Sequence, residues 1–230
     1  MRKVLAAAAA AFLMALPSCG SGNSNDNTAA MDDAAGYDLP HYDIAFSDSS
    51  TVKKADRRVV VISASPRRGG NTDLLCDAFM KGATEAGGKV EKIFLADYNI
   101  GFFGEMHEQH PDTVVDGDDA PAIIAKMEAA DIIVLSSPVY YMNIDGQLKT
   151  LMDRCYRHKG LANKEFYYIT ACADAEESTA ETAIFAFRGF VVCLPDPVER
   201  GSVKAVGLGR KGAVEGTQYI DEAYRLGKTI

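Results

Sequence analysis

The sequence predicts an α/β fold in which helices cover both faces of a doubly wound parallel sheet. From residue 57 onward, short apolar runs rich in β-branched residues alternate with helical patterns. Parallel neighbours need right-handed crossovers, which the intervening helices supply. We therefore expect five parallel strands in one folded domain, residues 57–230.

The first strand is expected at residues 58–63, where a continuous β-branched run suits a strand covered on both faces. A helix follows the loop 63–72 and ends at Gly87 and Gly88. The other strands are expected at residues 89–95, 131–135, 166–172 and 190–194. The other helices are expected after Pro121 and at residues 146–157, 178–188 and 217–227.

Ligands of such sheets bind beyond the carboxyl ends of the strands. We therefore expect one crevice, surrounded by the loops at residues 63–72, 96–104, 136–145 and 171–177.

Composition narrows the class of protein. The chain has 230 residues, of which 47% are hydrophobic and 24% charged, and this excludes a wholly disordered chain. The net charge is −8, and no run of basic residues is longer than two. Nucleic-acid binding is disfavoured, because neutralising phosphates needs a basic face.

Residues 1–19 are expected to be a bacterial lipoprotein signal peptide. Arg2 and Lys3 precede an apolar run, residues 4–16, that is too short to span a bilayer. Leu16-Pro-Ser-Cys19 resembles a lipobox, in which Cys19 would be acylated and would anchor an exported protein to a membrane. The alternative is a secreted protein cleaved near Ser18 with Cys19 unmodified. Residues 20–56, rich in small polar residues, are expected to form a flexible acidic tether.

The loop Ser63-Ala-Ser-Pro-Arg-Arg-Gly-Gly-Asn-Thr72 indicates an anion site, because backbone N–H groups and the positive end of a helix dipole meet there. Gly69 and Gly70 permit close approach, and Arg67 or Arg68 would add a charge-assisted bond. Neither a Walker A loop nor a dinucleotide fingerprint is present, and a monophosphate fits best because no lysine is placed to balance more charge. The alternative is that Asn71 or Thr72 merely caps the helix.

Two motifs in this order resemble the flavodoxin-like NADPH-dependent FMN reductases and the related iron–sulfur flavoproteins. One is the loop 63–72, and the other is Ser136-Ser-Pro-Val-Tyr140 followed by Gln147-Leu-Lys-x-x-x-Asp153-Arg154. The resemblance implies a flavodoxin-like fold with strand order 2-1-3-4-5, bound FMN and a homodimer. It also implies that the FMN phosphate is held by Ser63, Ser65, Arg67, Asn71 and Thr72. The isoalloxazine would be lined by Pro138, Val139, Tyr140, Tyr141 and Asn143.

Within that second set, the backbone amides after Pro138 would face the N1–O2 and N5 edge of the flavin. Tyr140 and Tyr141 are also the candidates for contact with substrate, and the alternative for them is ordinary packing. We assign no general acid or base.

The chain departs from the family in two loops. Residues 96–119 carry no cysteine, where the iron–sulfur relatives have a cluster, so no iron–sulfur centre is expected. His107 and His110 form only a weak metal pattern, and a solvated loop is favoured. After the fourth strand, residues 170–177 lack the glycines of many relatives and carry three carboxylates. These differences would lower FMN affinity and disfavour a phosphorylated nicotinamide.

The four cysteines beyond Cys19 are expected to be buried thiols, and a disulfide between Cys172 and Cys193 is the less favoured alternative.

These observations together predict an FMN-dependent oxidoreductase. It would pass hydride or electrons from NAD(P)H or a membrane donor to a small acceptor such as a quinone. One alternative is an exported flavodoxin-like electron carrier or flavin-binding module without turnover of its own. Another is a degenerate domain that binds a different phosphate ligand.

Overall fold

The computed structural model describes residues 42–46, 56–110 and 116–230, all of which belong to one compact unit. The expected signal peptide, its Cys19 and most of the expected tether lie outside these residues and stay predictions. In the part of the chain that is described, no helix is both long and apolar enough to cross a bilayer.

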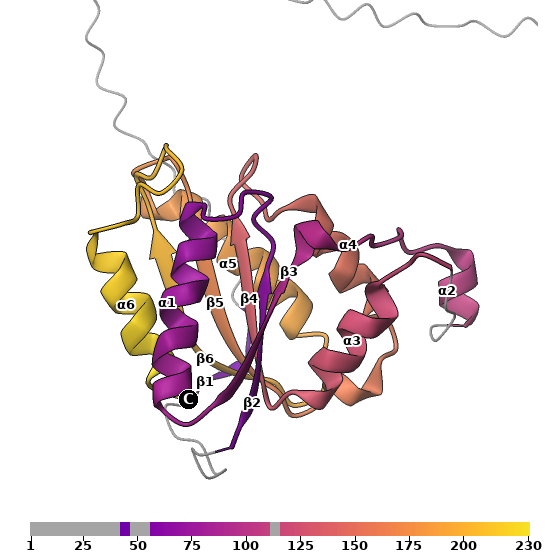
Figure 1. The fold of residues 1–230 in the computed structure, drawn as a ribbon. Helices are drawn as coiled ribbons and strands as arrows, with labels where there is room; N and C mark the ends of the chain where they lie inside the picture. Colours follow the sequence, from indigo (N-terminus) through magenta and orange to yellow (C-terminus); the bar gives the residue numbers. More distant parts are fainter. Residues whose placement is uncertain (1–41, 47–55, 111–115) are drawn as a thin grey trace, which may run out of the picture. The chain divides into compact units, whose positions relative to one another are not determined.

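The described residues form one six-stranded parallel sheet and six α-helices (Figure 1). The strands are β1 Ala45–Phe46, β2 Arg58–Ser63, β3 Lys89–Phe94, β4 Ile132–Pro138, β5 Glu165–Ala171 and β6 Val198–Ala205. The helices are α1 Asn71–Glu85, α2 Glu105–Gln109, α3 Ala120–Ala129, α4 Gly146–Arg154, α5 Glu177–Val191 and α6 Gln218–Gly227.

The strand order is β1-β6-β5-β4-β2-β3. The five longer strands therefore follow the expected order 2-1-3-4-5, which confirms the predicted fold class. The two-residue β1 adds a sixth strand beside β6. Just before it, Tyr42 stacks on Phe185 of α5, with ring centroids 5.0 Å apart.

The prediction of a strand at residues 190–194 is wrong. Phe190 and Val191 are the last residues of α5, and the strand that follows is β6. A short apolar run does not distinguish a strand from the end of a buried helix. β6 is difficult to recognise as a strand from its sequence, because it contains the charged residues Glu199, Arg200 and Lys204.

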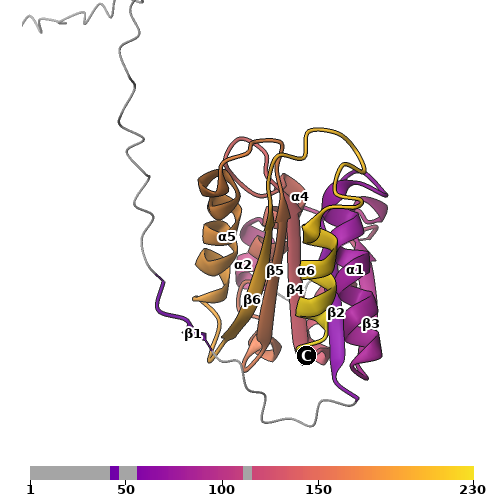
Figure 2. The same cartoon turned by 90° about the vertical axis from the view of Figure 1, so that its left-hand side faces the viewer.

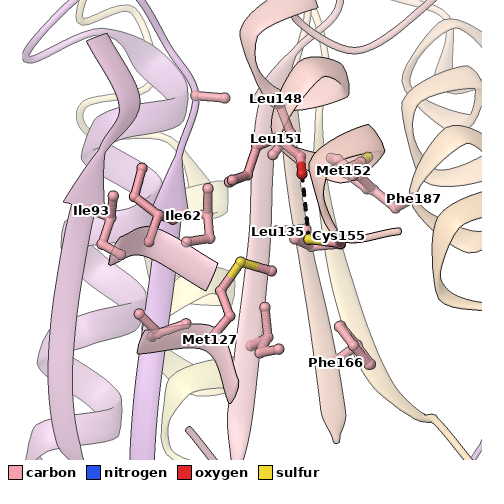
Figure 3. Close-up of a cluster of buried hydrophobic side chains, with 14 of the residues drawn as sticks. Ile62, Ile93, Met127, Leu135, Leu148, Leu151, Met152, Cys155, Phe166 and Phe187 are labelled. Carbon is pink, nitrogen blue, oxygen red and sulfur yellow. Dashed lines mark hydrogen bonds between the residues drawn. The ribbon is translucent and has the colours of Figure 1, made fainter. Parts of the chain in front are cut away.

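Helices cover both faces of the sheet, as expected. α1 and α6 lie on one face, and α3, α4 and α5 pack on the other (Figures 1 and 2). Figure 3 shows the second layer, where Ile62 and Leu135 of the sheet meet Met127 of α3 and Leu148 of α4. The carboxyl ends of the strands thus form one edge, at which α1, α4, α5 and α6 begin.

α1 and α6 approach each other more closely than side chains would allow. A Cβ added to Gly82 of α1 would lie 2.1 Å from the Tyr224 carbonyl oxygen. A Cβ added to Gly227 of α6 would lie 2.1 Å from the Phe79 carbonyl oxygen. Since real Cβ atoms do not come so close to backbone oxygens, the two glycines set the distance between these helices.

Replacing Gly82 by alanine is therefore expected to lower the free energy of unfolding by about 1–3 kcal/mol, the usual cost of overpacking. Urea denaturation monitored by circular dichroism measures this loss. Gly146→Ala is the matched control, because a Cβ at this helix start meets nothing within 4 Å. Equal stability of the two variants would contradict the proposed close packing.

Candidate functional site

The loop between β2 and α1 forms a backbone cradle. Gly69 has a φ of +68°, which favours glycine, and a Cβ on Gly70 would lie only 2.8 Å from the Arg67 carbonyl oxygen. Gly70 is also the N-cap of α1 and has no side chain to accept the first N–H groups of the helix. The Ser65 hydroxyl accepts the Arg67 N–H at 3.2 Å and closes the turn. The positive end of α1 is thus presented to a ligand without a protein cap.

A buried carboxylate supports this cradle from behind. Asp73 accepts the Gly69 N–H at 2.8 Å and the Ser63 hydroxyl at 3.1 Å, and it pairs with Lys92 Nζ at 2.5 Å. Burial alone would raise the pKa of Asp73, but the bonds from Lys92, Gly69 and Ser63 together bring it below its ordinary value. Asp73 therefore stays ionised, and its charge is compensated by Lys92.

The two arginines of the loop have different surroundings. Arg68 forms a bidentate pair with Asp97 at 2.6 and 2.7 Å and stacks over the Phe94 ring at 4.2 Å. Arg67 forms no ion pair with any described residue and lines the crevice at the carboxyl edge. Of the two, Arg67 is thus available to an anion.

The loop after β4 contains a tight turn with two residues in the left-handed region. Tyr141 and Met142 have φ values of +49° and +58°, and Tyr140 and Asn143 pair across them through backbone hydrogen bonds of 2.8 and 3.1 Å. Non-glycine residues rarely adopt this conformation, and such strain gathers at functional sites. The turn leaves the Tyr141 side chain fully exposed.

Two backbone N–H groups of this loop have acceptors within the protein. The Val139 N–H donates to the Ala171 carbonyl at 3.1 Å, and the Tyr140 N–H donates to Asn143. These two amides, the first after Pro138, are engaged within the protein. The expectation that amides of this segment face a flavin edge stays a prediction.

The loop after β6 reaches the same edge, and the Asn71 side chain holds it there. The Asn71 amide nitrogen donates to the carbonyls of Leu208 (3.0 Å) and Arg210 (2.8 Å), and its oxygen accepts the Val214 N–H (3.2 Å). On the other side, the Leu208 N–H donates to the Cys172 carbonyl at 2.8 Å. The loop is thus fixed between α1 and the end of β5.

These segments enclose a crevice of about 290 Å³. It is lined by Ser65, Arg67, Gly70, Asn71, Thr72, Pro138, Val139, Tyr140, Ala171, Cys172, Ala173, Leu208, Gly209 and Lys211. Seven of the ten residues expected at a cofactor site are in this set.

The other three lie elsewhere. Ser63 is fully buried, and its hydroxyl supports Asp73, so it does not reach the crevice. Tyr141 extends into solvent at the tip of the turn. Asn143 closes the turn and borders a neighbouring groove.

The loop after β6, which includes Lys211, lines the crevice although the sequence did not predict it there. Residues 96–104 were expected around the crevice, but none of them lines it. That stretch is instead held by the motif on α4. Arg154 donates to the Gly101 carbonyl at 3.0 Å and forms a buried ion pair with Asp118, and the Gln147 amide donates to the Tyr98 carbonyl at 3.0 Å. The sequence Gly207-Leu-Gly-Arg-Lys-Gly212, with three glycines and two cations, could have indicated that the loop after β6 belongs to an anion site.

Two of the three carboxylates after β5, Asp174 and Glu177, are engaged within the protein. Asp174 accepts the Thr179 hydroxyl at 2.8 Å and the Glu176 N–H at 3.1 Å, and these two bonds hold the pKa of Asp174 below its usual range. Glu177 pairs with Lys204. Their charge toward the crevice is therefore smaller than the sequence alone suggests.

The described cysteines form no disulfide, and the described residues contain no cluster of candidate metal ligands. The four described cysteines are free; Cys76, Cys155 and Cys172 are buried, whereas Cys193 is exposed, contrary to expectation. Burial raises the pKa of the Cys172 thiol, which keeps it neutral beside the crevice. Within residues 42–46, 56–110 and 116–230, no three His, Cys, Asp or Glu side chains are grouped to hold a metal ion.

A larger groove of about 740 Å³ lies beside the turn, between α4 and α5. Its lining is mostly apolar, and the cation in it, Lys149, pairs with Asp153 at 2.5 Å. It lacks the helix start and the unpaired cation of the smaller crevice. We therefore place the anion site in the smaller crevice.

Residues 57–194 match the family described as NADPH-dependent FMN reductase. The chain belongs to this family. The cofactor of this family is FMN.

Curated relatives agree with the family assignment. Iron–sulfur flavoproteins of Methanocaldococcus jannaschii and Methanosarcina thermophila are 39% identical over 100 residues and 35% identical over 112 residues. These matches cover 42% and 46% of this chain and 51% and 58% of the relatives. The chain thus spans about half the length of the curated relatives it matches.

Solved structures share the fold at low sequence identity. An NAD(P)H:quinone oxidoreductase from Methanothermobacter marburgensis superposes with a TM-score of 0.60 at 19% identity, over 76% of this chain and 96% of that chain. An FMN-dependent NADH-azoreductase from Bacillus anthracis, solved with FMN, gives 0.53 at 15% identity, over 75% and 96%.

The crevice has the features that an FMN molecule requires. At one end, the uncapped start of α1 and Arg67 suit a phosphate. At the other end, Ala171 at the end of β5 and Ala173 just after it line the crevice together with the Pro138–Tyr140 segment. The donor set therefore fits the phosphate of the cofactor.

The Asp73 network is expected to make stability fall in acid. A carboxylate with a depressed pKa stabilises the fold above the unfolded value of about 3.9, and this contribution is lost as pH falls through the lower, folded pKa. The free energy of unfolding should thus decrease below about pH 4, and Asp73→Asn should remove part of this decrease. Urea titrations at several pH values measure both.

Asp77→Asn is the matched control for that experiment. Asp77 pairs with the same Lys92 at 2.7 Å but is largely exposed. If the two variants showed the same pH dependence, the buried network would not be the cause.

Proposed function

We propose that this protein is an FMN-dependent oxidoreductase that takes electrons from NAD(P)H or another donor and passes them to a small acceptor such as a quinone. The observation that carries the proposal is the crevice at the carboxyl edge, which joins a phosphate cradle to the Pro138–Tyr140 segment in a chain of this family. FMN, when bound, would supply the redox chemistry by accepting a hydride or electrons and releasing them.

The residues of the chain bind and orient the cofactor. Ser65 and Thr72, with the first N–H groups of α1, would hold the phosphate, and Arg67 would add a charge-assisted bond. Asn71 would act indirectly, since its amide is committed to the loop after β6.

Tyr140 and Pro138 would form one wall of the ring site, and the backbone pairing of Tyr140 with Asn143 would keep that wall rigid. Tyr141, at the exposed tip, is positioned to contact an acceptor or a partner from outside. Neither tyrosine is assigned a proton-transfer role.

Removing the Arg67 guanidinium should weaken FMN binding roughly tenfold, the effect of losing one charge-assisted hydrogen bond at a solvated site. Flavin fluorescence quenching on titration into apoprotein measures the dissociation constant. Arg68→Ala is the matched control, because Arg68 is paired with Asp97 outside the crevice. FMN binding that is equally affected in both variants would contradict the assignment of the phosphate site.

Anaerobic stopped-flow absorbance tests the redox activity itself. The flavin-loaded protein should be bleached by NADPH or NADH and reoxidised by a quinone. Normal photoreduction without reduction by either nucleotide would favour an electron carrier instead. A colourless protein that does not bind added FMN would contradict both functions and favour a different phosphate ligand.

A further inference from the structure

The loop after β6, residues 206–217, brings a second cation to the phosphate cradle. The Asn71 side chain donates two hydrogen bonds to this loop and accepts one from it, and the Leu208 N–H donates to the Cys172 carbonyl. These four bonds fix the loop against α1 and the end of β5. The position of Lys211 is therefore determined by backbone contacts on both sides.

The Lys211 side chain extends over the turn that precedes α1. Its Cε atom lies 3.6 Å, and its Nζ atom 3.9 Å, from the position that a Cβ on Gly69 would occupy. It lines the same crevice as Ser65, Arg67 and Thr72. Lys211 is exposed to solvent, and its ammonium group lies beside the cradle.

Three other cations around this edge are paired with carboxylates. Arg68 pairs with Asp97, Lys92 with Asp73 and Asp77, and Lys204 with Glu177 and Glu181. Among the described residues, no carboxylate forms an ion pair with Lys211 or Arg67. Arg210, the neighbour of Lys211, is not part of the crevice lining.

We propose that Lys211 is a phosphate-binding residue of the cofactor site, supplied by the last loop of the sheet and acting with Arg67. The inference rests on the proposed function, because the anion is taken to be the FMN phosphate. A phosphate monoester carries nearly two negative charges at neutral pH. Arg67 and Lys211 together match that charge, and the helix start adds a fraction of a positive charge.

This assignment also changes the expected specificity. The sequence indicated that no lysine was available near the loop 63–72, so only one cation was counted there. With Lys211 included, the site discriminates FMN from riboflavin, which has the same ring but no phosphate. The loss of Lys211 should therefore affect the two flavins differently.

The test compares FMN and riboflavin binding to the full-length apoprotein and its variants by fluorescence quenching. Lys211→Ala should weaken FMN binding roughly tenfold, the effect of one charge-assisted hydrogen bond, and leave riboflavin binding unchanged. Arg210→Ala is the matched control and should change neither by more than about twofold, since its side chain lies outside the crevice. Lys211→Arg should restore most of the FMN affinity.

Three outcomes overturn the inference. If Lys211→Ala binds FMN as the unaltered protein does, Lys211 is not a phosphate ligand, although the proposed function stands. If FMN and riboflavin are weakened equally, the substitution has damaged the loop and not a phosphate contact. If the unaltered protein binds neither flavin, both the inference and the proposed function fail.

Discussion

The side-chain amide of Asn71 joins the first and the last loop at the carboxyl edge of the sheet. Its three hydrogen bonds reach residues 137 to 143 positions later in the chain. Each such bond contributes only about 1 kcal/mol to stability. The importance of this side chain is geometric, because it ties the loop that carries Lys211 to the start of α1, beside the cradle that Gly69 and Gly70 form.

Charge around the cradle is arranged in two layers. The inner layer is compensated: Asp73 is buried, ionised and paired with Lys92, and it fixes the Gly69 backbone. The outer layer consists of Arg67 and Lys211, which face the crevice without a described carboxylate partner. An anion entering from solvent thus meets positive charge, while the negative charge that shapes the loop is shielded behind it.

The alternation of strands and helices from residue 57 onward predicted a doubly wound parallel sheet, and the family resemblance carried by the loop 63–72 and the motif at residues 136–140 implied its strand order. The strand prediction failed at β6, where charged side chains are paired with residues distant in the sequence. Glu199 of β6 is paired with Arg188, and Lys204 with Glu177 and Glu181, so a strand with these charges looks like a loop. Because the last strand was predicted at residues 190–194, the loop that follows β6 and carries Lys211 was not predicted to lie at the carboxyl edge. Ser63 shows a second limit of prediction from sequence. Its residue type does not tell whether the hydroxyl contacts a ligand or, as here, donates to the buried carboxylate of Asp73.

The glycine contact between α1 and α6 has a consequence for binding. α1 follows the cradle and α6 follows the Lys211 loop, and the two helices touch through Gly82 and Gly227 near their C-terminal ends. At these two glycines the backbones of the helices are in contact with no side chain between them. The two halves of the anion site are therefore held at a set spacing before any ligand arrives, which reduces the ordering entropy that binding would otherwise cost.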